Sequence, residues 1–247
     1  SNKTELDDLF TTERFTSSIG ILIDFGIIVN KKIIEYFPKG IINSHFSLLP
    51  ELRGADPLSF AILEGKTMTG VSLMLLVEAM DEGPLLHQSE YRVGSDETTP
   101  TLTDKLIVQS ADDLSMIVPQ WVNGEIQAYE QDETTTKPTY TRKLSKNDGI
   151  MDFNKTAVVL EREVRAYADW PKSRTTLGDI HCAITQAAVV KETGTPGTLL
   201  VEKDRLLIYA GTNALQIKRI KPDGKKEMDI AGFLNGYKDR LISQNIK

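Results

Sequence analysis

Residues 41–50, Ile-Ile-Asn-Ser-His-Phe-Ser-Leu-Leu-Pro, form the stretch around which the rest of the chain is organised. Its apolar, β-branched start predicts a strand, and Pro50 stops that strand because proline cannot donate to a sheet. Successive side chains of a strand point to opposite faces, so Asn43 and His45 share one face. Two polar side chains on one face at a strand end are candidates for binding a reacting group.

The residues before this stretch complete a β-α-β unit. Ser18–Phe25 is an apolar run that predicts a buried parallel strand, and Asn30 begins a short helix that ends at Phe37. Ligands of such units bind beyond the carboxyl ends of the strands, so Phe25-Gly26-Ile27 and His45–Pro50 lie where a site is expected. A helix over Thr4–Phe15 is expected to start the chain.

The remaining pattern predicts two domains. Residues 1–128 form an α/β domain with a mainly parallel sheet, residues 129–147 form an extended polar linker, and residues 148–247 form a small antiparallel barrel. Spacing near ten residues between short β-rich runs indicates the barrel. Further helices and strands are expected at Pro57–Glu64, Gly70–Val77, His87–Val93, Leu102–Val122, Thr156–Tyr167, Ile180–Val190, Thr198–Val201, Arg205–Tyr209 and Leu215–Ile220.

Charge divides the chain in the same way. The net charge is −6, but residues 1–136 hold 9 Lys and Arg against 22 Asp and Glu, a net −13. Residues 137–247 hold 20 against 13, a net +7. A basic half is typical of a domain that meets a polyanion, and the alternative is a lysine-rich surface that keeps the domain soluble.

Composition argues against several other classes of protein. The longest apolar runs are far shorter than the roughly 18 residues of a spanning helix, so we expect no membrane segment. The single cysteine, Cys182, cannot form an internal disulfide, and no Cys and His cluster has zinc spacing. We therefore expect a protein of a reducing compartment that holds no metal.

Asp81, in the predicted turn Met80–Pro84, is the acid best placed by topology to reach His45. An imidazolium held by a carboxylate, beside the Asn43 amide, offers two donors to an oxygen that becomes negative, as when an amine attacks a formyl carbon. The alternative is that His45 is a hydrogen-bonded structural residue and Asp81 a turn former. Arg53-Gly54 either binds an anion or packs a loop.

The chain resembles the formyltetrahydrofolate-dependent formyltransferases. The resemblance covers the chain from about residue 4, and further motifs of the linker and C-terminal part resemble members that formylate methionyl-tRNA. The motifs are Asn43–Pro50, Arg53-Gly54, Pro57, Gly65, Thr69-Gly70-Val71, Met80–Gly83, Gln131-Asp132-Glu133, Tyr140-Thr141, Lys143–Lys146 and Trp170-Pro171.

The resemblance implies a Rossmann-like formyltransferase domain followed by an OB-like domain that helps to hold tRNA. It implies formyl transfer from 10-formyltetrahydrofolate to the amino group of methionine on initiator tRNA. It also implies an enzyme of bacterial type located in the cytoplasm, with an organellar matrix as the alternative. Asn43, His45 and Asp81 match the family's catalytic trio. Ser47, Leu48, Leu49 and Pro50 match its folate-binding segment, and Phe25, Gly26, Ile27 and Ile28 match a loop lining the pterin pocket. A monomer is favoured.

The chain departs from the family at its start. Family members carry about two further β-α units before the first predicted helix, including a Gly-Thr-Pro loop and a basic loop that reaches tRNA. We therefore expect the catalytic domain to be N-terminally incomplete, with an uncovered sheet edge near residues 19–25. Two alternatives stay open: a formyltransferase acting on an amino sugar nucleotide, and a non-catalytic RNA-binding remnant.

Overall fold

The computed structural model describes residue 10, residues 15–23 and residues 29–242. The helix expected over Thr4–Phe15 lies outside these residues except for Phe10 and Phe15, and the expected loop Phe25-Gly26-Ile27 with Ile28 lies outside them entirely. The chain divides into two compact units. Residues up to 61, 66–94 and 102–143 form the first, and residues 62–65, 95–101 and 144 onward form the second.

The first unit is built on a four-stranded sheet in the order β1-β2-β4-β5. Its strands are β1 (Gly20–Ile23), β2 (Ile41–His45), β4 (Met68–Leu75) and β5 (Leu85–Arg92). The short helix α2 (Lys31–Ile34) connects β1 to β2, and the Asn30 side chain accepts a hydrogen bond from the Ile33 backbone N–H at 3.0 Å. The β-α-β unit predicted from the sequence is confirmed.

The α/β class is confirmed, but the described sheet is mixed, whereas a mainly parallel sheet was predicted. β1 pairs with β2 in parallel, whereas β2 with β4 and β4 with β5 pair antiparallel. The antiparallel β4–β5 pair follows from its short connection, residues 76–84, because a parallel crossover needs about a dozen or more residues. The run Ser18–Phe25, from which a parallel strand was predicted, contains β1, which does pair in parallel with β2.

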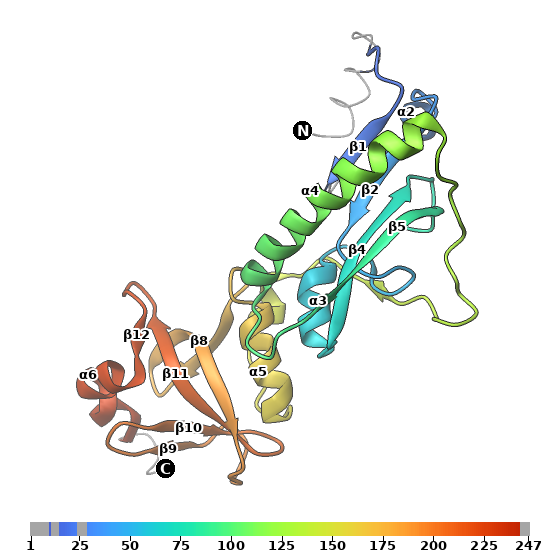
Figure 1. Ribbon diagram of the computed structural model, residues 1–247. Helices are drawn as coiled ribbons and strands as arrows, with labels where there is room; N and C mark the ends of the chain where they lie inside the picture. The colour runs from blue at the N-terminus through green and yellow to red at the C-terminus, as the bar shows by residue number, and fades with distance from the viewer. Residues whose placement is uncertain (1–9, 11–14, 24–28, 243–247) are drawn as a thin grey trace. The chain divides into compact units, whose positions relative to one another are not determined.

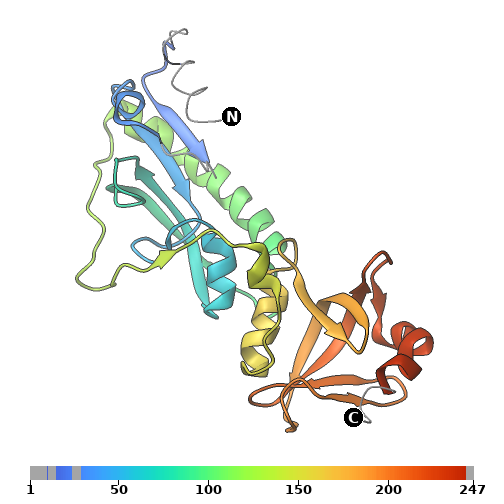
Figure 2. The ribbon, with the colours of Figure 1, turned by 180° about the vertical axis from the view of Figure 1, so that it is seen from behind.

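Helix α4 (Thr99–Asn123) lies along one face of the sheet (Figures 1 and 2). Its buried apolar side chains recur at helical spacing, as the sequence predicted for Leu102–Val122. Two polar contacts fasten it to the sheet: Ser44 Oγ lies 2.7 Å from Ser110 Oγ, and Ser89 donates a short hydrogen bond to Asp113. The buried apolar residues of α4 are Leu102, Leu106, Leu114 and Ile117.

Part of the predicted linker is a strand of the first unit. β6 (Tyr140–Thr141) pairs in parallel with β3 (Arg53–Gly54), which follows β2 and precedes helix α3 (Pro57–Leu63). Before it, Tyr129 exchanges two backbone hydrogen bonds with Leu85 of β5, at 2.7 and 2.9 Å. Composition predicted an irregular segment here. It could not reveal either pairing, because each joins residues that are far apart in sequence.

The second unit is a curled antiparallel sheet with two helices (Figure 2). The strand order is β7-β8-β11-β10-β9, with β12 paired to β11. The predicted barrel-like antiparallel arrangement is confirmed, while β7, β12 and α6 were not predicted. The elements are the short 3-10 helix η1 (Lys146–Gly149), α5 (Ala157–Ala166), β7 (Ser173–Leu177), β8 (Ile180–Val190), β9 (Leu199–Val201), β10 (Leu206–Tyr209), β11 (Ala214–Pro222), β12 (Met228–Asp229) and α6 (Ile230–Ile242).

One apolar core holds this unit together. Leu160 of α5, Leu206 of β10 and Phe233 of α6 are fully buried within it, and the Phe233 ring stacks on Tyr237 at 4.9 Å between centroids. Among the described residues, no helix combines the length and the apolar character needed to cross a membrane.

Candidate functional site

Strand β2 directs its side chains to two different environments. Ile42 is fully buried and Ser44 contacts α4, so these two residues face the helix. Asn43 is half-buried between Leu22 of β1 and Met74 of β4, its register partners, and lies on the face opposite α4 with His45. The shared face of Asn43 and His45 follows from the strand period, as expected from the sequence.

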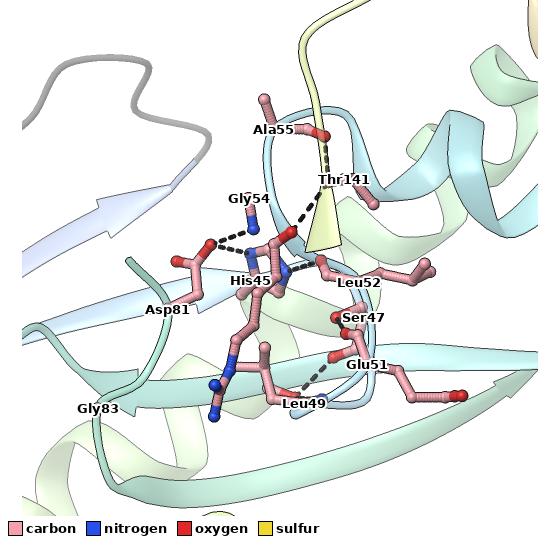
Figure 3. Close-up of polar contacts among 12 residues, drawn as sticks. His45, Ser47, Leu49, Glu51, Leu52, Gly54, Ala55, Asp81, Gly83 and Thr141 are labelled. Atoms are coloured by element: carbon pink, nitrogen blue, oxygen red, sulfur yellow. Dashed lines mark hydrogen bonds and ion pairs between the residues drawn. The ribbon is translucent and has the colours of Figure 1, made fainter. Parts of the chain in front are cut away.

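His45 is held between a backbone carbonyl and a carboxylate (Figure 3). Its side chain is only 7% exposed. Nε2 lies 2.9 Å from the carbonyl oxygen of Leu52, and Nδ1 lies 3.8 Å from Oδ2 of Asp81. A carbonyl only accepts, so we assign a proton on Nε2 to this bond, and Nδ1 is the nitrogen that faces Asp81.

Nδ1 of His45 makes no hydrogen bond of ordinary length with Asp81. At 3.8 Å the Asp81 carboxylate is beyond the usual hydrogen-bond distance but close enough to attract an imidazolium. Asp81 therefore faces Nδ1 as an acidic neighbour without a direct hydrogen bond to it. The geometry brings together the two residues that the sequence analysis paired.

Asp81 occupies an uncommon backbone conformation at the tip of the β4–β5 connection. Its φ is +55°, a left-handed value that non-glycine residues rarely adopt. The Gly54 backbone N–H donates to Asp81 Oδ2 at 2.7 Å, the same oxygen that faces His45. Gly54 itself has a φ of +100°, and an added Cβ would lie 2.5 Å from the Thr141 carbonyl oxygen. Glycine at position 54 thus lets β3 approach β6 while its N–H orients Asp81.

Arg53 packs a loop, which decides between the two alternatives left by the sequence. Its guanidinium is 2% exposed and donates to Gln131, Glu133 and Tyr140. Burial alone would lower the pKa of Arg53, but hydrogen bonds with Glu133 and Tyr140 outweigh it, and the pKa is raised above its ordinary value. The side chain is therefore a permanent buried cation with protein partners.

Ser72 of β4 hydrogen-bonds to the backbone of the predicted folate-binding segment. Its hydroxyl donates to the Ser47 carbonyl at 2.6 Å and accepts from the Leu49 backbone N–H at 3.1 Å. Gln88 adds donors to the Leu49 carbonyl and to the Ser72 hydroxyl, both at 2.9 Å. These bonds connect two strands of the sheet to the turn that follows β2, so the turn is fixed without any ligand.

The four residues of this segment differ in what they can offer. Ser47 is fully buried, and its hydroxyl donates to the Glu51 carbonyl at 2.6 Å. Leu49 and Pro50 are also buried, whereas Leu48 is half-buried. Gly70 makes room for Leu48, since a Cβ there would lie 2.7 Å from Leu48 Cδ2. Leu48 is therefore the side chain of the segment with the most exposed surface.

The sequence predicts Asn43, His45, Asp81 and the turn after β2, but not the groups that hydrogen-bond to them. Leu52 and Gly54 act through backbone atoms, which no side-chain pattern reveals. Gln131 and Ser72 are ordinary polar residues in sequence, and only the Gln131-Asp132-Glu133 motif hinted at the first. Phe25, Gly26 and Ile27 lie outside the described residues, and their predicted role stays a prediction.

The donor set suits an oxygen that develops negative charge. The Asn43 amide and the His45 imidazole are both possible hydrogen-bond donors, and both lie on one face of β2. No cluster of three or more His, Cys, Asp or Glu side chains that could hold a metal ion occurs in the part of the chain that the structure describes. The arrangement can polarise a carbonyl or formyl group by hydrogen bonds.

The second unit carries a basic cavity of about 480 Å³. Four lysines line it together with Ala168, Thr185 and Glu227. A concave surface lined mainly by one sign of charge focuses a positive potential, which favours an anionic ligand. The lysines are Lys172, Lys221, Lys225 and Lys226.

Fold and site together define a formyltransferase, and the chain belongs to the formyl transferase family. Residues 4–116 match the model described as formyl transferase, and residues 143–238 match that of the formyl transferase C-terminal domain. Among individual proteins, the chain is similar to methionyl-tRNA formyltransferase of Herpetosiphon aurantiacus. The two are 35% identical over 228 residues, which cover 91% of this chain and 74% of that protein.

Two solved structures show the same fold at low sequence identity. HypX from Aquifex aeolicus, in complex with tetrahydrofolic acid, superposes with a TM-score of 0.64 at 15% identity over 89% of this chain and 39% of that chain. The N-formyltransferase from Helicobacter canadensis, in complex with folinic acid and dTDP-3-aminofucose, gives 0.63 at 17% identity over 80% and 71%. The chain thus spans about two fifths of the HypX chain.

Proposed function

We propose that this protein transfers a formyl group from 10-formyltetrahydrofolate to the amino group of methionyl-tRNA, the initiator of bacterial-type translation in the cytoplasm. The observation that carries the proposal is the geometry of His45, with Nε2 fixed by the Leu52 carbonyl and Nδ1 facing Asp81. Family membership and the methionyl-tRNA formyltransferase of Herpetosiphon aurantiacus support the choice of donor and acceptor.

Three side chains divide the work. The folate co-substrate supplies the formyl group. Asn43 and His45 donate hydrogen bonds to the formyl oxygen, and these bonds strengthen as negative charge develops there. Asp81 stabilises the imidazolium and, directly or through a water, accepts the proton that the attacking amine releases. As the C–N bond to the methionine nitrogen forms, the C–N bond to the folate nitrogen breaks, and the folate nitrogen takes up that proton as tetrahydrofolate leaves.

The turn Ser47–Pro50 is the proposed folate-binding segment. Ser72 and Gln88 hold its backbone in place, so the turn needs no reorganisation to receive a ligand. Leu48 offers apolar surface for an aromatic ring system. Phe25, Gly26 and Ile27 are proposed as the further wall of this pocket, from the resemblance alone.

The tRNA is proposed to contact the second unit through its phosphates. Residues 137–247 carry a net +7, and four lysines line one cavity there. Each phosphate neutralised by a lysine releases condensed counterions, so binding must weaken with salt. The slope of log K against log salt should fall by about 0.7 to 0.9 for each such lysine removed.

A second candidate function is formyl transfer to an amino sugar nucleotide. The observation in its favour is the likeness of fold to the Helicobacter canadensis N-formyltransferase, whose complex holds dTDP-3-aminofucose. The catalytic trio serves any primary amine, so it does not discriminate between the two acceptors. A non-catalytic RNA-binding protein is the third possibility.

One assay separates the three functions. Purified protein is incubated with 10-formyltetrahydrofolate and either methionyl-tRNA or dTDP-3-aminofucose, and formylated product is measured by mass spectrometry. Formylation of methionyl-tRNA alone supports the proposal. Formylation of dTDP-3-aminofucose alone refutes it in favour of the second candidate function. No turnover with salt-sensitive tRNA binding points to the RNA-binding protein.

The lysine cavity provides a matched test of the tRNA contact. Lys225→Ala with Lys226→Ala should weaken tRNA binding and reduce the salt slope by about 1 to 2. Lys203→Ala, an exposed lysine that does not line the cavity, is the control. Equal losses from both variants would exclude the cavity as a specific phosphate site.

A further inference from the structure

Gln131 stands between the buried cation Arg53 and the loop that carries Asp81. Arg53 Nη2 and Nε both donate to Gln131 Oε1, at 2.6 and 3.1 Å. Gln131 Nε2 then donates to two carbonyl oxygens of the loop, Asp81 O at 2.7 Å and Gly83 O at 2.9 Å. The side chain is 8% exposed, so these bonds have little competition from water.

The guanidinium fixes which way the Gln131 amide points. An amide can rotate to exchange its oxygen and nitrogen, but a guanidinium has donors only and cannot accept from an NH₂ group. Oε1 must therefore face Arg53, and Nε2 must face the loop carbonyls. The buried Arg53 cation thus orients the Gln131 amide so that Nε2 donates to the backbone carbonyls of Asp81 and Gly83, on either side of Glu82.

Tyr140 makes a second connection from Arg53 to the same loop. Its hydroxyl accepts from Arg53 Nη1 and donates to Glu82 Oε1, both at 3.1 Å. Arg53 Nη1 also lies 3.6 Å from Glu82 Oε1. Three successive loop residues, 81 to 83, are therefore connected to one guanidinium.

The loop needs such restraint because Asp81 is held in a left-handed conformation. That conformation costs free energy for a residue with a Cβ, and it persists only where neighbours impose it. Asp81 also sits 3.8 Å from His45 Nδ1, a distance that a small change of the loop backbone would alter. Gly54, the residue after Arg53, donates to the Asp81 carboxylate, so the Gly54 backbone and, through Gln131, the Arg53 side chain act on the same loop.

We propose that Gln131, oriented by Arg53, is a positioning residue that sets the Asp81 carboxylate opposite His45. Gln131 touches no reacting atom in this role, and it acts through the backbone of residues 81–83. Tyr140 supports the same loop through Glu82. The kinetic part of this inference rests on the proposed function, but the effect on His45 does not.

The central test replaces Gln131 with glutamate. Gln131→Glu keeps the size and the acceptor for Arg53 but removes both donors to the loop. Formyl transfer to methionyl-tRNA should lose about 10-fold or more in kcat, with KM for both substrates changed less than about 2-fold. Glu133→Gln is the control, because it neutralises the other side chain that accepts from Arg53 Nη2 while keeping an acceptor oxygen and all the loop hydrogen bonds of Gln131, and it should stay within about 2-fold of wild type.

A double variant tests the route of the effect. In an Asp81→Asn background, Gln131→Glu should change kcat less than about 2-fold, because the residue acts through that carboxylate. A full additional loss there, or an unchanged kcat in Gln131→Glu alone, overturns the proposal. Tyr140→Phe, which removes one exposed hydroxyl, should lower kcat in the same direction by about 3-fold and serves if Gln131→Glu does not fold.

A spectroscopic measurement separates this inference from the choice of substrate. The protein has three histidines, so ¹⁵N-histidine labelling gives a simple spectrum, with His45 assigned from His45→Ala. The ring nitrogen signals of His45 should move in Gln131→Glu and Tyr140→Phe but not in Glu133→Gln. Movement without any turnover refutes the proposed function and keeps the positioning role, whereas signals that do not move refute the positioning role.

Discussion

The two compact units bury polar side chains very differently. Of thirteen buried polar or charged side chains among the described residues, ten lie in the unit that holds His45 and three in the second unit. The second unit instead surrounds Phe233 and Leu160 with apolar neighbours. Burying a polar group costs free energy unless its hydrogen bonds with water are replaced. The polar interior of the first unit therefore contributes less to stability than an apolar one, but it holds side chains in fixed orientations.

This difference in polar burial predicts that substitutions in the two units affect stability and catalysis to different extents. Substitutions in the apolar core of the second unit should change stability more than chemistry. Substitutions in the polar cluster of the first unit should change chemistry more than stability. The two tryptophans allow each unit to be followed alone, because Trp121 belongs to α4 and Trp170 to the second unit.

The largest expected effect is on the core of the second unit. Phe233→Ala removes a fully buried ring and should cost about 3–5 kcal/mol in the free energy of unfolding. Trp170 fluorescence in a Trp121→Phe background measures it by urea titration. If Trp121 in the reciprocal background reports an equal loss, the two units unfold together and the comparison fails.

The next effect is on chemistry in the first unit. His45→Ala should lower kcat about 100-fold, about 2.7 kcal/mol of transition-state stabilisation, by removing the donor at Nδ1. Stopped or quenched formyl-transfer assays measure it. His87→Ala, a histidine on β5 beside Asp113, is the control and should retain activity within about 2-fold. Near-normal turnover of His45→Ala would remove it from the catalytic site.

The hydroxyl groups of Ser72 and Thr69, both on β4, allow a bonded and an unbonded buried hydroxyl to be compared within the described part of the first unit. Ser72→Ala deletes a group with three partners and should cost about 1–3 kcal/mol of stability, while raising KM for the folate co-substrate. Thr69 Oγ1 is equally buried on β4 but has no hydrogen-bond partner among the described residues. Thr69→Val should therefore be neutral or stabilising, as measured by urea unfolding. A greater cost for Thr69→Val than for Ser72→Ala would contradict this assignment.

The smallest effect concerns one of the few buried charges of the second unit. Burial raises the pKa of Glu163 above its ordinary value of 4.5, opposed by its hydrogen bond with Lys155 at 2.6 Å. A raised carboxyl pKa means that the folded state holds the proton more tightly. Stability should therefore fall as pH rises from about the ordinary value through the raised value, and change no further above it.

Glu163→Gln should remove this part of the pH dependence. Urea unfolding of wild type and variant, followed by Trp170 between about pH 4 and 7, measures the difference. Parallel curves for the two proteins would assign the pH dependence to other groups. Lys155→Met, with Glu163 unchanged, tests the opposing contact: losing the ammonium should raise the Glu163 pKa further, so the fall in stability should extend to higher pH.

Local patterns carried much of the fold. Asn30 at the start of α2, the period of α4 and the β-rich runs of β8 to β11 act over a few residues, so the ends of their elements were predicted within three positions. The direction of β4 and β5, the pairing of β3 with β6, and helix α6 were not predicted. These depend on contacts between residues far apart, which periodicity does not encode.

The sequence by itself determined that Asn43 and His45 share a face at the end of a strand, because side-chain alternation is a property of the extended backbone. It also determined the family, through motifs spread over most of the chain. Only the tertiary structure decided that Arg53 is a buried cation and that Gln131 grips the Asp81 loop. Hydrogen-bond partners 50 to 80 residues apart are joined by folding and leave no trace in local sequence.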